Sequence, residues 1–322
     1  MITPITFPTA FRYWLQASSG PIELCSFAEL PCTDQSAETL LRDARIFHME
    51  EPLHVLVAKP DHRHISTRFS AHVLPRNLAP GSFAKLTDSL YIISPECCFL
   101  LAANFFSLPE LVCAANDLCA VYRSDAISAL GQSGRPALTD KNAISHYLDH
   151  SYNIKGLKTA RQALKYAVNC SNSPMESKLA ALFCLPLKLG GFGLPVPLMN
   201  PAIELTLNAA SFLGRDNCRV DMLWETPKVV LEYDSNLTHL SREQHHYDKK
   251  RATSLAMSGY TVISVTADHL NSHSSIDKLC LDLRSALGIR THMDRFNKYS
   301  KIRHETVEKI IYRRAGVQKL RL

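Results

Sequence analysis

An apolar run that ends in two acids constrains this chain more than any other feature. Val229–Leu231 have the composition of a buried β-strand, and Glu232 and Asp234 follow directly with one residue between them. Because side chains alternate along a strand, both carboxylates lie on the same face. Two adjacent charges on a core-like strand are costly unless a cation neutralises them.

The flanking segments predict a mixed fold for the second half of the chain. The segments "CRVDMLW" and "KVVLEYDS" flank the short turn "ETP", which predicts an antiparallel hairpin. A helix is expected over residues 242–258 and a strand over 260–266. With a helix from "SPMESKLAALFC" and one further strand before the hairpin, the expected order is helix, three strands, helix, strand.

Two further acids occur at positions that suit a cation site. Glu176 lies in the first turn of the expected helix at Ser173, and Asp221 lies on the first hairpin strand. Hard divalent ions such as Mg²⁺ bind a few carboxylates and several waters. Each acid also has a simpler explanation, because Glu176 has capping-box spacing from Ser173 and Asp221 can mark a strand end.

The first half combines short strands with helices. The segments "LHVLVAKPDH" and "HISTRFSAHVL" predict a hairpin that bends at Pro60 and Asp61. Ser94, followed by Pro95, and Ser107 predict two helix starts. The Ser-, Gly- and Pro-rich stretch 123–143 predicts a domain boundary, so we expect a mixed α/β domain over 1–145, a second domain over 146–286 and a basic tail over 287–322.

The positive charge of the chain is concentrated in that tail. The chain has a net charge of +6. Residues 287–322 contain ten Lys or Arg and three Asp or Glu, a balance of +7, which leaves 26 minus 27, or −1, for the rest. Such a block suits contact with a polyanion such as nucleic acid. A solvated basic helix is the alternative.

The composition is that of a globular protein, with 46% apolar and 20% charged residues over 322 positions. The longest apolar stretches fall well short of the roughly 20 residues that a membrane-spanning helix needs. The first residues lack the pattern of a secretory signal, and the ten cysteines lie mostly in apolar runs without a CxxC pair. We therefore expect a cytoplasmic protein with reduced, structural thiols and no contact with a membrane.

Residues 173–270 resemble endonuclease domains of the PD-(D/E)XK superfamily, in the group related to the very-short-patch mismatch-repair endonuclease. In that group a helix supplies a Glu, here Glu176, and the next strand supplies an acid, here Asp221 ahead of Trp224. The pattern "E-x-D-G-x-x-x-H" follows, with Glu232, Asp234 and His239 in place and Ser235 instead of the usual Gly. The resemblance implies an αβββαβ restriction-endonuclease-like core.

The helix and strand after this pattern also match the group. Its pattern "D-x-x-R-x-x-x-L-x-x-x-G-[YW]-x-V" is met in register by Asp248, Arg251, Leu255, Gly259, Tyr260 and Val262. The usual superfamily Lys is absent because Asp234 occupies its place. His239 is therefore the first candidate for activating the attacking water and Lys249 the second, although a lone histidine past a strand is also typical of a surface.

The first half resembles AbiEi-type antitoxin-like regulators, which precede such nuclease domains in bacterial and phage-defence proteins. The residues that carry this resemblance are "LHVLVA", "SPECCFLLAANFFSLPELV" and "GLKTARQALKYA". It implies a module that recognises DNA or a protein partner.

The two resemblances together imply a Mg²⁺- or Mn²⁺-dependent endonuclease that cleaves nucleic acid, most naturally DNA, in defence, repair or a toxin–antitoxin-like system. The expected metal ligands are Asp221, Glu232, Glu176 and Asp234, and the same four acids with His239 form the expected catalytic set. The expected nucleic-acid contacts are Asp248, Lys249, Arg251, Lys298, Lys301, Arg303, Arg313 and Arg314. A simple ion pair between Asp248 and Arg251 is the alternative for that pair. A non-catalytic DNA-binding regulator and a structural role in a defence complex are the competing functions.

Overall fold

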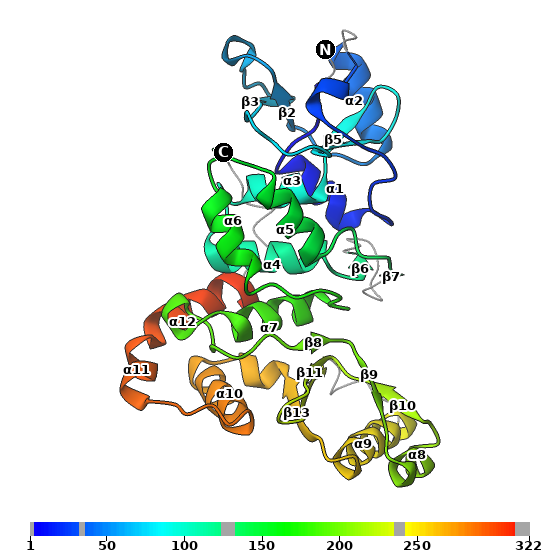
Figure 1. The fold of residues 1–322 in the computed structure, drawn as a ribbon, viewed down its shortest axis with the longest axis vertical. Coiled ribbons are helices and arrows are strands. Elements are labelled where there is room, and N and C mark those ends of the chain that lie inside the picture. Colours follow the sequence, from blue (N-terminus) through cyan, green and yellow to red (C-terminus); the bar gives the residue numbers. More distant parts are fainter. Residues whose placement is uncertain (1–2, 32–35, 124–132, 235–241, 313–322) are drawn as a thin grey trace. The chain divides into compact units, whose positions relative to one another are not determined.

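The computed structural model describes residues 3–31, 36–123, 133–234 and 242–312, and it divides the chain into two compact units. Among the described residues, the first unit comprises the chain up to Lys165, and the second runs from Tyr166 to Tyr312. Both units contain helices and strands, so the protein is a mixed α/β protein (Figure 1). None of the described helices has the length and apolar character needed to cross a bilayer.

The first unit is built on short strands that meet at Ile5. The strands β2 (Leu53–Val57) and β3 (Phe69–Val73) pair with each other, and β4 (Phe83–Lys85) pairs with β1 (Leu24–Cys25) and β5 (Tyr91–Ile93). Ile5 forms single bridges to Val55 and to Ile92 and so joins the two groups of strands. The short strands β6 (Tyr122–Arg123) and β7 (Ser133–Gly134) form a separate pair.

Helices complete the first unit. They are α1 (Thr9–Gln16), α2 (Ala37–Ile46), α3 (Pro95–Ala102), α4 (Leu108–Leu118), α5 (Lys141–Asp149) and α6 (Leu157–Leu164), with short 3-10 turns η1 (Phe27–Glu29) and η2 (Pro60–His62). Both predicted helix starts are confirmed, because Ser94 caps α3 and Ser107 forms a capping box with Glu110 at α4.

Two predictions about the first half are wrong. The strands β2 and β3 are parallel, with Leu53 opposite Phe69, so they are not a hairpin. The domain boundary lies after Lys165 and not after residue 145, because α5 and α6 pack on α3 and α4 through buried side chains such as Ile144 and Ala160. These two helices therefore belong to the first unit.

The second unit contains a four-stranded sheet with the order β13-β12-β11-β8. The strands are β8 (Leu198–Met199), β11 (Met222–Trp224), β12 (Val229–Asp234) and β13 (Thr261–Thr266). The pairs β8–β11 and β11–β12 are antiparallel, whereas β12 and β13 are parallel and are connected through α9 (Arg242–Met257). The predicted helix and final strand are confirmed, and the hairpin is confirmed for Met222–Trp224 with Val229–Leu231. Its first strand is shorter than predicted, because Asn217–Arg219 pair with Ala202–Glu204 instead and Asp221 lies just before β11.

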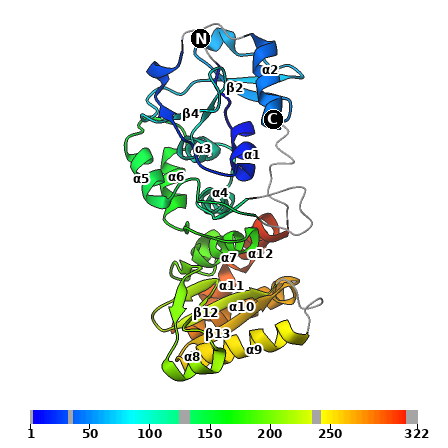
Figure 2. The same ribbon diagram turned by 90° about the vertical axis from the view of Figure 1, so that its right-hand side faces the viewer.

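The helix α9 and a small subdomain cover one face of this sheet (Figure 2). That subdomain consists of β9 (Ala202–Glu204) paired with β10 (Asn217–Arg219) and of α8 (Leu207–Leu213). Leu223 and Val230 of the sheet are buried in one cluster with Leu213 of α8 and Leu255 of α9. The side of α9 that carries Leu255 therefore packs against the sheet.

The remaining elements of the second unit are helical. They are α7 (Pro174–Cys184), η3 (Leu187–Leu189), η4 (Ala267–Leu270), α10 (His273–Ala286), α11 (Met293–Lys298), α12 (Ser300–Val307) and the π-helical turn η5 (Glu308–Tyr312). The turn η5 packs on α7 and α12 packs on η3. The expectation of a separate tail from residue 287 is therefore wrong up to Tyr312, because this segment folds into the second unit.

Candidate functional site

The pairing of β11 with β12 brings two of the predicted acids together. Met222 lies opposite Leu231, so extending the antiparallel register by one residue places Asp221 opposite Glu232. Opposite residues on neighbouring strands have Cβ atoms only about 5 Å apart. By alternation, both acids continue the face of Leu223 and Val230, which α9 covers.

The third acid, Glu176, joins them from the first turn of α7. Ser173 caps this helix by accepting a hydrogen bond from the Glu176 backbone N–H at 3.1 Å. The Glu176 carboxylate accepts hydrogen bonds from the Asn172 backbone N–H at 2.9 Å and from the Asn200 side chain at 2.6 Å. Its side chain is buried, and its charge and that of Asp221 both act on Glu232. The cap and the acid site therefore share one residue.

Asn200 connects Glu176 to Asp221. Its Nδ2 donates to Glu176 Oε2, and its backbone N–H donates to the Asp221 carbonyl oxygen at 2.9 Å. Asp221 Oδ2 in turn accepts the Tyr233 backbone N–H at 2.7 Å. Glu176 and Asp221 are thus held by backbone and amide donors from adjacent elements.

Arg251 of α9 forms an ion pair with Glu232. The Nη2 atom of Arg251 lies 2.5 Å from Glu232 Oε2, and its Nη1 donates to the Arg219 carbonyl oxygen at 3.2 Å. Leu255 lies one turn further along α9 and is buried against the sheet, so the same helix face carries Arg251 to the acids. Arg251 therefore forms its ion pair with Glu232. The alternative that the sequence suggested, an ion pair between Arg251 and Asp248, is not the one that forms.

The acids share a buried environment that disfavours their charged forms. Burial raises the pKa of Glu176 and that of Asp221, and the Asp221 charge adds to the rise at Glu176. Burial, with the charges of Asp221 and Glu176, raises the pKa of Glu232 to about 7, even though Arg251 lowers it. Burial and the neighbouring negative charges therefore raise the pKa of Glu232 by more than Arg251 lowers it.

One atom at the site lacks a partner. Glu232 Oε1 is buried and accepts no hydrogen bond from the residues that the structure describes. Carboxylate oxygens are the donors that hard divalent cations prefer, so the chemistry of the cluster and this free oxygen suit such an ion. Within the described ranges, however, no three His, Cys, Asp or Glu side chains are grouped as a metal site.

The remaining predicted residues of this region are Asp234, His239, Asp248 and Lys249. Asp234 ends β12 and is half-buried, on the face of Glu232 by alternation. His239 lies outside the described residues. Asp248 is half-buried and Lys249 is exposed on α9. The structure thus brings together Glu176, Asp221 and Glu232, and it adds Arg251 to them.

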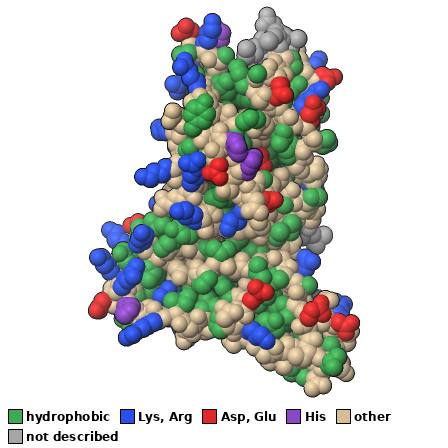
Figure 3. All heavy atoms as spheres, viewed as in Figure 1, with side chains coloured by type: hydrophobic (Ala, Val, Ile, Leu, Met, Phe, Trp, Pro, Cys, Tyr) green, Lys and Arg blue, Asp and Glu red, His purple; other side chains and the backbone are tan. Residues whose placement is uncertain are grey.

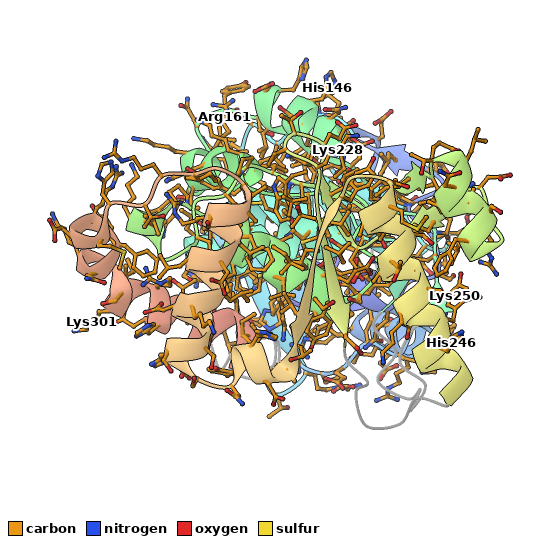
Figure 4. All side chains as sticks on the ribbon, turned by 90° about the horizontal axis from the view of Figure 1, so that it is seen from below. His146, Arg161, Lys228, His246, Lys250 and Lys301 are labelled. Carbon is orange, nitrogen blue, oxygen red and sulfur yellow. The ribbon has the colours of Figure 1, made fainter. Side chains whose placement is uncertain are left out.

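The basic residues of the last helices separate into two groups. Lys298 and Lys301 are exposed, and Lys and Arg side chains gather over α11 and α12 (Figure 3). Lys301 projects outward from α12 (Figure 4). Arg303 is fully buried, where its guanidinium pairs with Asp277 at 2.7 Å and stacks 3.9 Å from the Phe296 ring. The prediction that Arg303 contacts nucleic acid is therefore wrong, and Arg313 and Arg314 lie outside the described residues.

Asn200 is the residue of this cluster that the sequence patterns did not reveal. Its backbone has a φ of 53°, a left-handed conformation that asparagine adopts more readily than most residues. The available signal was the dipeptide Asn200-Pro201, which is typical of a turn. Such a signal predicts the turn but not the carboxylate that the side chain binds.

Comparisons with known proteins give distant relatives. Two uncharacterized proteins from two strains of Mycobacterium tuberculosis are each 24% identical to this chain over 173 residues. The matched segment covers 54% of this chain and 56% of each relative, so the chain spans about half the length of the curated relatives it matches. No protein-family model matches the chain. No solved structure is significantly similar to it.

Proposed function

We propose that the second unit is a metal-dependent endonuclease that hydrolyses phosphodiester bonds, with DNA as the substrate. The observation that carries this proposal is the convergence of Glu176, Asp221 and Glu232 from three separate elements onto one buried site with an unpartnered oxygen. A cluster of like charges is costly to bury, so it points to a function that needs it.

The topology of the second unit supports the same proposal. When the turn η3 and the inserted β9, α8 and β10 are set aside, α7, β8, β11, β12, α9 and β13 follow one another in the αβββαβ order that the resemblance implies, and the four strands lie side by side in one sheet. Glu176 lies in the first turn of α7, Asp221 directly precedes β11 and Glu232 lies on β12, which supports the proposal. The distant relatives neither add to this argument nor oppose it.

Asp221 and Glu232 would hold Mg²⁺ or Mn²⁺, with Glu176 and Asp234 as further carboxylates nearby. When bound, such an ion polarises the scissile phosphate and lowers the pKa of a bound water. Glu232 already offers Oε1 but shares Oε2 with Arg251. We therefore propose that Arg251 leaves Glu232 when the cation is bound and then pairs with a phosphate oxygen, as a guanidinium readily does.

The proton balance of the site rests on two residues. Glu232, with a pKa of about 7, holds a proton for part of the time at neutral pH, and it would lose that proton when a bound cation stabilises its charge. His239 remains our proposed acid or base for the attacking water or the leaving oxygen.

The exposed cations that we propose for contacts with the phosphate backbone are Lys249, Lys298 and Lys301.

Nicking of supercoiled plasmid by the full-length protein tests this function. We expect cleavage that requires Mg²⁺ or Mn²⁺ and that falls at least about 100-fold in Asp221→Asn and Glu232→Gln. The matched control is Glu204→Gln, which changes an exposed glutamate of β9 in the same unit. Activity that survives in both site variants, or that does not depend on the metal, contradicts the proposal.

One observation favours a second function, a non-catalytic DNA-binding regulator. Each of the three acids already accepts a hydrogen bond or ion pair from the protein, and no metal group is formed among the described residues. In that case Arg251 and Asn200 would be permanent structural partners. Wild type and both variants would then be equally inert with Mn²⁺ and would shift DNA equally in a gel.

A further inference from the structure

The first unit contains a cavity of about 360 Å³ that the proposed nuclease function does not use. It lies between the end of β3, the end of α3 and the loop that precedes α6, and its lining includes His72, Arg76, Phe105 and Lys155. This volume is within the range of roughly 300–1,000 Å³ in which proteins bind small molecules.

The inner wall of the cavity is aromatic and aliphatic. Phe7 and Phe105 both line it, and their rings are stacked with centroids 4.9 Å apart and an interplanar angle of 27°. Leu56, Leu101 and Ile154 complete the apolar wall. Phe7 is buried, whereas Phe105 is half-buried and lines the cavity. A flat apolar ligand can pack against such a wall.

The polar part of the lining carries positive charge. Arg76 and Lys155 are exposed, and neither forms an ion pair within the described part of the chain. No Asp or Glu contributes to the lining. The backbone of Lys155 is fixed by a hydrogen bond of 3.1 Å from Asn104 Nδ2 to its carbonyl oxygen, which leaves Asn104 Oδ1 as an acceptor beside the cavity. Two cations without a counterion at an apolar cavity attract an anionic group.

His72 adds a neutral hydrogen-bonding group. Its Nε2 lies 2.9 Å from Nδ1 of His54, and the two rings are stacked at an interplanar angle of 16°. Burial lowers the pKa of His72 and, with His72, lowers that of His54 to about 4, so the pair is uncharged at neutral pH. One ring donates to the other, and the positive charge at the cavity is left to Arg76 and Lys155.

We propose that this cavity binds a small aromatic anion, whose ring packs on the Phe7–Phe105 wall and whose phosphate, carboxylate or sulfonate pairs with Arg76 and Lys155. A nucleoside monophosphate and an aromatic carboxylate share this chemistry. The proposal concerns the first unit alone and does not depend on cleavage by the second.

Calorimetric titration of the full-length protein tests the ligand class with four probes: adenosine monophosphate, naphthalene sulfonate, neutral adenosine and decanoate. We expect saturable binding of at least one of the two aromatic anions, at least tenfold tighter than that of adenosine. Binding of decanoate with no binding of either aromatic anion overturns the aromatic assignment. Absence of saturable binding of both aromatic anions at millimolar concentration overturns the site.

Variants then test the location. The double variant Arg76→Gln/Lys155→Gln is expected to weaken binding of the aromatic anion at least tenfold, and Phe105→Leu is expected to weaken it several-fold. Lys158→Gln is the matched control, because Lys158 is an exposed lysine of α6 outside the lining. All four positions are exposed or half-buried, and thermal unfolding checks that each variant is folded. Affinity that is unchanged in the folded double variant overturns the proposal.

Discussion

Glu232 occupies a position where its negative charge destabilises the folded protein. Folding raises its pKa from 4.5 to about 7, chiefly through burial. The folded state therefore binds this proton more tightly than the unfolded chain does. The resulting stabilisation is complete below about pH 4.5 and is lost as the pH rises through about 7. The raised pKa values of Glu176 and Asp221 act in the same direction.

Because the pKa of Glu232 is raised in the folded state, the first prediction is a loss of stability with rising pH. Between pH 5 and pH 8 the free energy of unfolding of the second unit should fall by up to about 3 kcal/mol through Glu232 alone. The fall should be smaller in Glu232→Gln and unchanged in Glu204→Gln. Urea denaturation at a series of pH values measures it. Equal slopes in wild type and Glu232→Gln would contradict the high pKa of Glu232.

The second prediction concerns Asn200, whose side chain donates to Glu176. Asn200→Asp replaces this donor by a fourth carboxylate but keeps a residue that tolerates a positive φ. We expect a loss of about 1–3 kcal/mol in the free energy of unfolding at pH 8 and a smaller loss at pH 5. The control is Asn217→Asp, at an exposed position of β10. A loss that does not depend on pH would show that charge repulsion is not the cause.

At the scale of helices, the segment after α10 contains cations with opposite roles. Arg303 is buried against Phe296 and Asp277, whereas Lys301 is exposed two residues earlier. Removing one partner of a buried ion pair leaves an uncompensated charge. The burial of Arg303 therefore assigns it to the stability of the fold.

The third prediction separates these roles. Arg303→Ala should lower the free energy of unfolding of the second unit by about 3–5 kcal/mol, whereas Lys301→Ala should change it by less than about 0.5 kcal/mol. Lys301→Ala should instead weaken DNA binding and reduce its dependence on salt concentration. Chemical denaturation and gel shifts over a salt series measure the two effects. Equal stability of Arg303→Ala and wild type would contradict the structural role.

The sequence predicts elements well where the signal is local. The caps at Ser94 and Ser107 and the hairpin around Pro227 depend on neighbouring residues, and the structure contains all three. The pairing of β2 with β3 depends on distant residues. The tight turn lies at Ser66–Phe69 and returns β3 parallel to β2, while Ile5 occupies the other edge of β2. The turn-forming residues at Pro60 therefore could not predict that β2 and β3 are parallel.

The acid site was predictable in part for the same reason. The alternation of Glu232 and Asp234 and the register of the hairpin place acids on one face from local pattern alone. The partner of Glu232 was not predictable, because Arg251 reaches it only through the packing of Leu255 against the sheet. The burial of Arg303 likewise results from contacts with Asp277 that the sequence does not display.

At the scale of the whole molecule, the chain passes from the first compact unit to the second between Lys165 and Tyr166. The acids and Arg251 all belong to the second unit, and the aromatic cavity belongs to the first. Each unit has its own buried core. The units are therefore expected to respond to different ligands and different pH ranges.

The fourth prediction is that calorimetry resolves two unfolding transitions. Only one transition should shift in Glu232→Gln, and Mn²⁺ should raise the midpoint of that same transition. Adenosine monophosphate or naphthalene sulfonate should raise the midpoint of the other. One cooperative transition that moves as a whole with every ligand would contradict the independence of the units.

The parallel pairing of β12 with β13 also sets the order in which a newly made chain completes this region. Val229 pairs with Thr261, so the strand that carries Glu232 gains its second neighbour only after the whole of α9 has left the ribosome. Glu176, Asp221 and Glu232 are all synthesised before Arg251, which lies in α9. The ion pair between Glu232 and Arg251 therefore requires that α9 has been made and has packed on the sheet.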